Sequence, residues 1–121
     1  MSKRVRVVED QEDNRQILRD LLANVGYEMI EAQNGEEALT VARTQLPDLI
    51  LMDIQLPVLD GYEATRRIKA QPDLRHIPII VVTSYALSGD EEKARAAGCD
   101  AYVAKPYSAR KLLETINRYL R

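Results

Sequence analysis

The chain has 121 residues, enough for one ordinary domain, and its hydrophobic fraction of 45% and charged fraction of 30% are typical of a folded protein. With a formal net charge of -2 and no basic stripe, direct nucleic-acid binding is not expected, and no apolar run reaches the roughly 20 residues of a membrane helix. The chain has one cysteine and does not open with a secretory signal, so we expect one cytoplasmic domain over residues 1–121, with no attached output domain.

Residues 5–8 form the first predicted strand, and a helix follows it. Asp13, with Gln16 three residues later, is the predicted N-cap of this helix, and Gly26 is predicted to end it. Apolar residues recur at helical spacing along this predicted helix: Ile17, Leu18, Leu21, Leu22 and Val25.

The second predicted strand, at residues 27–32, differs from the first because two glutamates interrupt it. Asn34 with Glu37 predicts the start of the next helix, and Pro47 is predicted to break it. One face of this helix is predicted to be apolar and to carry four residues: Ala38, Leu39, Ala42 and Leu46.

Three further strand–helix pairs complete the pattern. The strands are predicted at residues 48–53, 77–83 and 101–104. Each is followed by a helix with a predicted N-cap, in chain order Asp60, Ser88 and Ser108. Five alternating pairs predict a parallel sheet with helices on both faces.

The apolarity of the strands predicts their order in the sheet. The first, third and fourth are apolar enough to be buried on both faces, whereas 27–32 is charged and 101–104 is short. We therefore expect these two at the edges, in the order 2-1-3-4-5 of the doubly wound, five-stranded, flavodoxin-like α/β/α fold. In such sheets ligands bind beyond the carboxyl ends of the strands, at the switch point between strands one and three.

Acidic side chains collect at the predicted carboxyl ends of the switch-point strands. Glu9 and Asp10 follow the first strand, and Asp53 closes the third. Three carboxylates brought together raise one another's pKa, and a hard divalent cation relieves that conflict. Oxygen ligands without histidine or cysteine indicate Mg²⁺ rather than zinc or copper.

The other strand ends supply a hydroxyl and an ammonium group. Thr83 and Ser84 close the fourth strand, and Lys105 follows the fifth. Asp53 then suits the role of a nucleophile that forms an aspartyl phosphate. Mg²⁺, Lys105 and Thr83 would each meet an oxygen of the phosphoryl group, so the chemistry would depend mainly on positioning and electrostatics.

Four motifs follow one another along the chain: Val7-Val8-Glu9-Asp10; Asp53 with Pro57 and Asp60-Gly61; Val82-Thr83-Ser84; and Lys105-Pro106. In this order the chain resembles, over essentially its whole length, the receiver domain of two-component response regulators, in particular the single-domain chemotaxis regulators. The resemblance implies a signalling switch in which Asp53 takes a phosphoryl group from a histidine kinase or a histidine phosphotransfer protein.

The same resemblance implies roles for individual residues. Glu9, Asp10, Asp53 and the main-chain carbonyl of Gln55 would hold Mg²⁺. Lys105 would bind the phosphoryl group, and its bond to Pro106 would be cis. Such a domain would promote only its own phosphorylation and dephosphorylation, and we do not expect another enzymatic activity.

The switch implied by the resemblance runs through the fourth and fifth strands. Thr83 and Lys105 would move toward the phosphoryl group, Tyr102 would rotate into the space that Thr83 leaves, and the small Ser84 would allow close approach of its loop. The output surface would comprise helix 88–97, strand 101–104 and helix 108–120. This surface would control a downstream protein, and a phosphorylation-dependent homodimer is possible. Ordinary strand packing is the alternative role for Thr83 and Tyr102.

The resemblance also implies that two positions beside the site, Gln55 and Tyr85, tune the rate of dephosphorylation. Tyr85 is bulky, and we hypothesise that it hinders the attacking water and lengthens the phosphorylated lifetime.

Three other functions fit the residues less well. A haloacid-dehalogenase-type enzyme normally carries a second aspartate two residues after the nucleophile, where this chain has Gln55. A flavodoxin-type cofactor binder needs a phosphate-binding loop after the first strand, and residues 9–13 are acidic instead. A phosphorylation-independent, receiver-like interaction module would not need the three acids and the lysine, which are all present.

Overall fold

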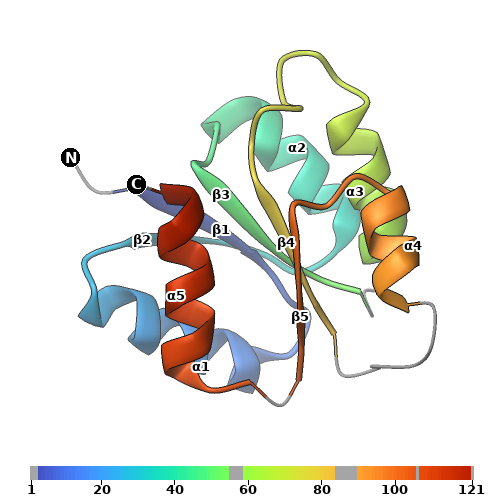
Figure 1. The fold of residues 1–121 in the computed structure, drawn as a ribbon. Coiled ribbons are helices and arrows are strands. Elements are labelled where there is room, and N and C mark those ends of the chain that lie inside the picture. The colour runs from blue at the N-terminus through green and yellow to red at the C-terminus, as the bar shows by residue number, and fades with distance from the viewer. Residues whose placement is uncertain (1–2, 55–58, 84–89, 106, 121) are drawn as a thin grey trace.

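The computed structural model describes residues 3–54, 59–83, 90–105 and 107–120. Five strands form one parallel sheet (Figure 1). In chain order they are β1 (Arg4–Val8), β2 (Glu28–Ala32), β3 (Leu49–Asp53), β4 (Ile79–Thr83) and β5 (Ala101–Ala104). Their order, β2-β1-β3-β4-β5, confirms the prediction that the charged and the short strand form the edges.

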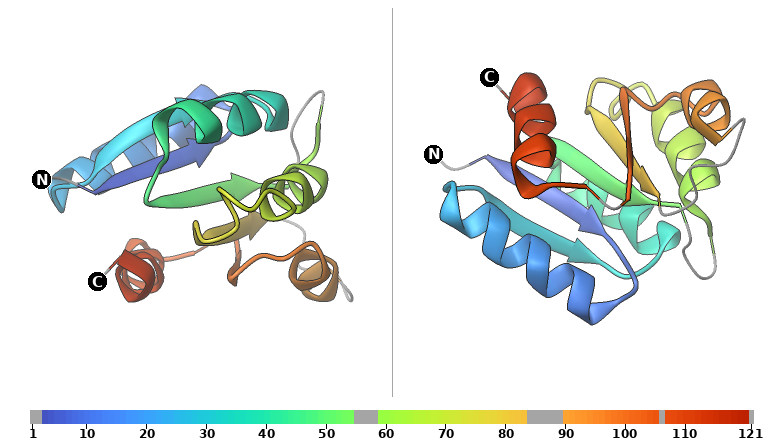
Figure 2. Two further views of the ribbon diagram at one scale, coloured as in Figure 1. Left: turned by 90° about the horizontal axis from the view of Figure 1, so that it is seen from above. Right: turned by 60° about the horizontal axis from the view of Figure 1, so that its bottom comes forward.

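A helix follows each strand and packs on one of the two faces of the sheet. The helices are α1 (Glu12–Asn24), α2 (Gly35–Gln45), α3 (Gly61–Lys69), α4 (Asp90–Ala96) and α5 (Ala109–Leu120). Buried residues of α1 and α5 form one core cluster with the sheet, and buried residues of α2, α3 and α4 form the other. The right-hand view of Figure 2 has α1 and α5 in front of the sheet.

The three central strands alternate side chains between these two cores. In β1, Val5 and Val7 enter the core under α1 and α5, and Val8 enters the other. The period of two along a strand explains this division, and burial on both faces explains the near-continuous apolar runs of β3 and β4.

Three of the predicted helix caps are confirmed by hydrogen bonds. Asn34 Oδ1 accepts from the Glu37 amide at 2.8 Å, and Asp60 Oδ1 accepts from the Glu63 amide at 2.9 Å. Ser108 Oγ accepts from the Lys111 amide at 3.0 Å. The fourth predicted cap, Ser88, lies outside the described residues.

The predicted cap of the first helix, Asp13, is wrong. The helix begins at Glu12 after Gln11, whose side chain makes no capping bond. Asp13 lies instead in the first turn, where a negative charge interacts favourably with the helix dipole.

Two of the apolar residues that recur at helical spacing in the predicted first helix are exposed, Ile17 at 61% and Val25 at 44%. The buried stripe of α1 consists of Arg15, Leu18 and Leu22, at spacings of three and four residues. Ile17 lies about 100° around the helix from Leu18, since each residue turns a helix by that angle, and Val25 lies beyond the last turn.

Leu46, one of the four residues predicted to share the apolar face of α2, is 56% exposed. It follows the last residue of α2 and has a φ of 40°, in the left-handed region. The chain reverses there and carries the side chain away from the inward face of α2.

Within the part of the chain that the structure describes, no helix is long and apolar enough to cross a bilayer.

Candidate functional site

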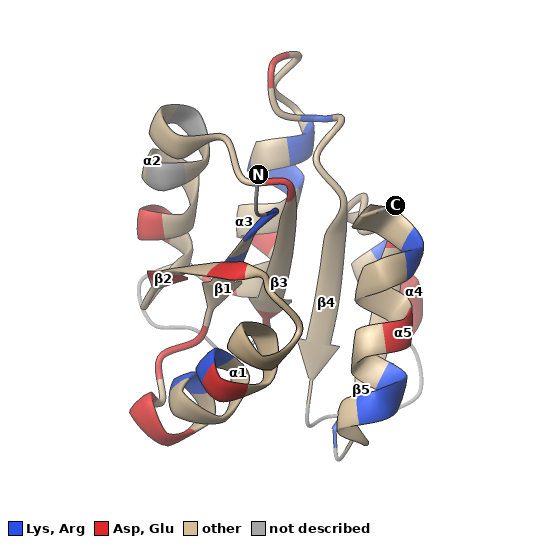
Figure 3. Ribbon diagram, turned by 90° about the vertical axis from the view of Figure 1, so that its left-hand side faces the viewer, with Lys and Arg blue, Asp and Glu red and all other residues tan. Residues whose placement is uncertain are grey.

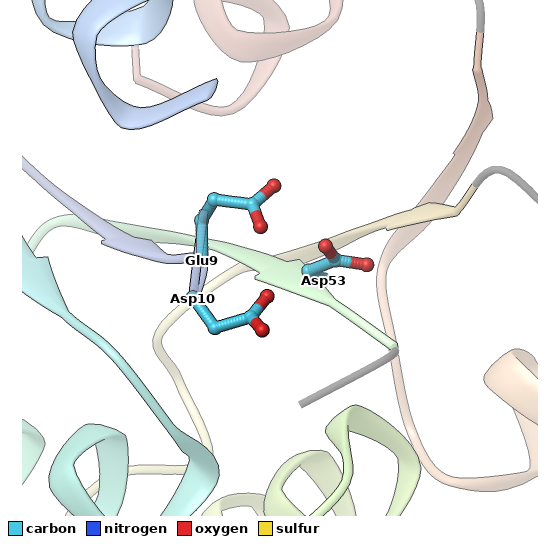
Figure 4. Close-up of side chains that lie close together, drawn as sticks. All are labelled: Glu9, Asp10 and Asp53. Carbon is cyan, nitrogen blue, oxygen red and sulfur yellow. The ribbon is translucent and has the colours of Figure 1, made fainter. Parts of the chain in front are cut away.

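Three carboxylates meet where β1 and β3 end. Glu9 and Asp10 extend from the end of β1 toward Asp53, the last residue of β3 (Figure 4). One carboxylate oxygen from each lies within 4.8 Å of those of the other two. The parallel pairing of β1 with β3, in which Val8 lies opposite Met52, brings them together.

The surroundings of this acidic cluster are themselves acidic. The segment that follows β1 and opens α1 contributes Glu12 and Asp13 as well as Glu9 and Asp10. Acidic residues are prominent along this segment, between β1 and α1, in Figure 3. Among the described residues, this is where carboxylates come close enough together to hold a metal ion. A site made of carboxylate oxygens fits a hard divalent cation such as Mg²⁺.

Glu9 is the most deeply buried of the three acids and is only 3% exposed. Its carboxylate accepts hydrogen bonds from the Gln11 amide at 3.2 Å and from Asn14 Nδ2 at 3.3 Å. Its carbonyl oxygen accepts a hydrogen bond from Arg15 Nη1 at 2.7 Å. Backbone and side chain are thus both fixed by the first turns of α1.

Lys105 meets the acids from the end of β5. Its Nζ lies 3.3 Å from Glu9 Oε1 and 3.5 Å from Asp53 Oδ2. Burial by itself lowers the pKa of Lys105, but the charges of Asp53 and Glu9 outweigh burial and raise the pKa above its ordinary value. The ammonium group is therefore a permanent positive charge beside Asp53 at physiological pH.

Backbone contacts hold the strand ends around the site in place. The Lys105 amide donates to the carbonyl of Thr83 at 2.6 Å, which ties the end of β5 to the end of β4. At Gly61, the first residue of α3, an added Cβ would lie 2.1 Å from the carbonyl oxygen of Asp53. The start of α3 therefore packs directly on the end of β3, and only glycine permits this approach.

The other predicted residues of the site divide into two groups. Thr83 is 1% exposed at the end of β4, and Tyr102 is partly buried in β5, packed against the core under α2, α3 and α4. The remaining four, Gln55, Ser84, Tyr85 and Pro106, lie outside the described residues, so the predictions made for them stay predictions.

Two residues that the motifs did not predict contribute to the site. Arg15 donates a hydrogen bond to the Glu9 carbonyl. The sequence signal that could have indicated it is an arginine at helical spacing from the buried Leu18 and Leu22. Tyr107 lines a small pocket together with Glu9, Asp53 and Lys105. Burial raises the pKa of its phenol; Lys105 opposes this rise, and Glu9 and Asp53 reinforce it.

A model of the response regulator receiver domain family matches residues 5–117. The chain is a response regulator receiver domain. It therefore belongs to two-component signalling and is a switch rather than a conventional enzyme.

Curated relatives of this receiver domain include the polar-differentiation response regulators DivK of Brucella anthropi and Brucella ovis. Each is 52% identical over 120 residues, which cover 99% of this chain and 98% of the relative. The receiver domain and these relatives thus correspond over nearly their full length.

Solved structures of other receiver domains have the same fold. The receiver domain of the sensor histidine kinase PA1611 from Pseudomonas aeruginosa is 39% identical, with a TM-score of 0.92 over 99% of this chain and 98% of that one. That structure holds a magnesium ion in its active-site cleft. The chemotaxis protein CheY4 of Vibrio cholerae is 29% identical, with a TM-score of 0.92 over 99% of this chain and all of that one.

Proposed function

We propose that Asp53 accepts a phosphoryl group from a histidine kinase or a histidine phosphotransfer protein, in the presence of Mg²⁺. The observation that carries this proposal is the position of the Asp53 carboxylate, between the acids Glu9 and Asp10 and the ammonium group of Lys105. The donor and this receiver domain would meet in the cytoplasm. Similarity to DivK favours polar differentiation as the process under control.

The proposed transfer forms one bond and breaks one. A carboxylate oxygen of Asp53 attacks phosphorus, and the bond from phosphorus to the donor's histidine nitrogen breaks, with the electron pair remaining on that nitrogen. When bound, Mg²⁺ supplies charge neutralisation for the phosphoryl oxygens. Glu9, Asp10, Asp53 and the Gln55 carbonyl would hold it, and Lys105 and the Thr83 hydroxyl would donate hydrogen bonds to the phosphoryl oxygens.

The proposed switch follows from the added charge. Phosphorylation adds about -1.5 to -2 at neutral pH. Lys105 now contacts both Glu9 and Asp53, and a phosphoryl group on Asp53 would draw it and Thr83 inward. Tyr102 would then rotate into the space that Thr83 leaves. The altered surface formed by α4, β5 and α5 would control binding of a protein partner or of a second copy of this chain.

Two pre-existing states are enough to explain such a switch. Moving their ratio from 1:99 to 99:1 requires the modification to favour the active state by about 5.5 kcal/mol. A smaller preference would produce a partial shift.

Incubation with acetyl phosphate and Mg²⁺, followed by intact-mass measurement, tests the proposal. We expect the parent and a control variant at an exposed acid away from the site, Asp73→Ala, to gain one phosphoryl group. Asp53→Ala should gain none. A parent that gains no phosphoryl group, or an Asp53→Ala variant that gains one, would refute the assignment.

A further inference from the structure

Arg15 is a cation buried directly behind the acidic cluster. It is the fourth residue of α1, is 7% exposed, and makes three close contacts. Its Nη1 donates to the Glu9 carbonyl oxygen at 2.7 Å, and its Nη2 donates to Glu12 Oε2 at 2.6 Å. Its Nε lies 3.2 Å from Glu31 Oε1 on the edge strand β2.

The first of these contacts acts on the peptide that joins two of the three acids. The Glu9 carbonyl belongs to the Glu9–Asp10 peptide group, which is planar and includes the Cα atom of Asp10. Fixing the carbonyl oxygen therefore restricts the position of this Cα atom and of the side chain attached to it. Asp10 needs this support, because it is only half-buried and accepts a long hydrogen bond of 3.3 Å from the exposed Gln11 side chain.

We propose that Arg15 is a positioning residue for the cation site. By holding the Glu9 carbonyl through Nη1 while its other nitrogens are fixed by Glu12 and Glu31, it orients the Asp10 carboxylate toward the cation site. This inference rests on the proposed function, since it concerns the same site. It assigns no contact between Arg15 and the ion or the phosphoryl group.

The charge of Arg15 is neutralised locally, which explains why a cation can lie so close to a cation site. Arg15 and Arg19 share two carboxylates: Glu12 bonds to both, and Glu31 bonds to both. Two positive and two negative charges leave this group of four neutral. The guanidinium of Arg15 therefore adds little repulsion toward Mg²⁺.

Because the group is neutral, the two possible roles of Arg15, charge and positioning, predict opposite changes in Mg²⁺ affinity when Arg15 is removed. Removing Arg15 leaves one excess negative charge near the site, which by Coulomb attraction alone strengthens Mg²⁺ binding. Loss of positioning weakens it instead, and groups that orient a metal ligand commonly contribute about tenfold or more in affinity.

Arg19 provides a matched control. It bonds to Glu12 and Glu31 as Arg15 does, and none of its hydrogen bonds among the described residues reaches Glu9. Arg15→Met and Arg19→Met make the same side-chain change and the same change in net charge. Only the first removes the bond to the Glu9 carbonyl.

The test is calorimetric titration of the parent and both variants with Mg²⁺, alongside phosphorylation of the parent by acetyl phosphate. We expect Arg15→Met to bind Mg²⁺ about tenfold more weakly than the parent and Arg19→Met to bind it at least as tightly as the parent. Equal affinities in the two variants, with a parent that is phosphorylated on Asp53, would overturn the inference and leave the proposed function standing. A parent that neither binds Mg²⁺ nor is phosphorylated overturns both.

A third variant keeps the test decisive if Arg15→Met does not fold. Arg15→Lys retains the charge but replaces the fork with one ammonium group, which cannot keep all three contacts of the guanidinium. We expect a several-fold loss of Mg²⁺ affinity without a change in net charge. Affinity equal to that of the parent would show that charge alone suffices and would overturn the assignment.

Discussion

Lys105 is the residue on which the electrostatics of the site depend. Its ammonium group lies within 3.5 Å of carboxylate oxygens of both Glu9 and Asp53. Without it, the carboxylates of Glu9 and Asp53 would lose the ammonium group that offsets their mutual repulsion. The same group that would bind the phosphoryl oxygens therefore also stabilises the unmodified site.

We expect Lys105→Met to lower stability at neutral pH, by an amount that Mg²⁺ partly restores. The folded-state pKa of Lys105 is raised, so its contribution is fully present below the ordinary lysine pKa of about 10.4 and is lost as pH rises through the folded-state value. The stability difference between parent and variant should thus be constant from about pH 7 to pH 9 and shrink at higher pH. Urea unfolding across this range measures it; a difference that grew with alkaline pH would contradict the assignment.

At the scale of the elements, the end of β3 and the start of α3 pack closely together. The Gly61 amide donates to the Ile54 carbonyl at 3.0 Å, and Gly61 faces the Asp53 carbonyl with no room for a Cβ. The strand that carries the proposed phosphoacceptor, Asp53, thus packs against the next helix at a glycine.

Gly61→Ala should push α3 away from the end of β3. We expect it to destabilise the protein by about 1–3 kcal/mol, the usual effect of overpacking, and to slow phosphorylation by acetyl phosphate. Gly26→Ala is the control, because Gly26 has a φ of +84° but no atom within 4 Å of an added Cβ. It should reduce stability through backbone strain alone and leave the phosphorylation rate unchanged. Equal rates in both variants would show that the α3 contact does not position Asp53.

The helix starts show what local sequence can and cannot predict. Asn34, Asp60 and Ser108 were predicted correctly because a cap bonds to an amide three residues away. Asp13 had the same spacing and is not a cap. In α1 the inward face carries Leu18 and Leu22, and Arg15 lies on the same face one turn earlier. Ile17 lies about 100° around the helix from Leu18 and is exposed.

For the whole molecule, the strand order was predictable because strands buried on both faces are more apolar in sequence than strands at the edges of a sheet. Charge in β2 and shortness in β5 placed both at the edges, and the order in turn predicted which strand ends meet. Tyr107 could not be predicted in this way. Its place beside the acids depends on tertiary packing between the end of β5 and the ends of β1 and β3, which a local sequence pattern does not indicate.

The cation site should couple to the stability of the entire fold, because the unfolded chain cannot bring its acids together. We expect Mg²⁺ to raise the Tm of the parent, with a gain of about 2.7 kcal/mol at a concentration of one hundred times Kd. Asp53→Asn should melt no lower than the parent in EDTA, because it removes one of three like charges. It should gain less from Mg²⁺ than the parent does.

Differential scanning fluorimetry of both proteins, with EDTA and with Mg²⁺, measures these shifts. A parent whose Tm is insensitive to Mg²⁺ would contradict cation binding by the acids, and a variant clearly less stable in EDTA would contradict repulsion among them.

The bond from Lys105 to Glu9 joins residues 96 positions apart, across β1, β3, β4 and β5. During synthesis the acids emerge early and their counter-charge emerges late. Until β5 has joined the sheet, Glu9 and Asp53 lack the ammonium group of Lys105 that the proposed transfer needs. On the proposed function, Asp53 would therefore accept a phosphoryl group only after the last strand has docked.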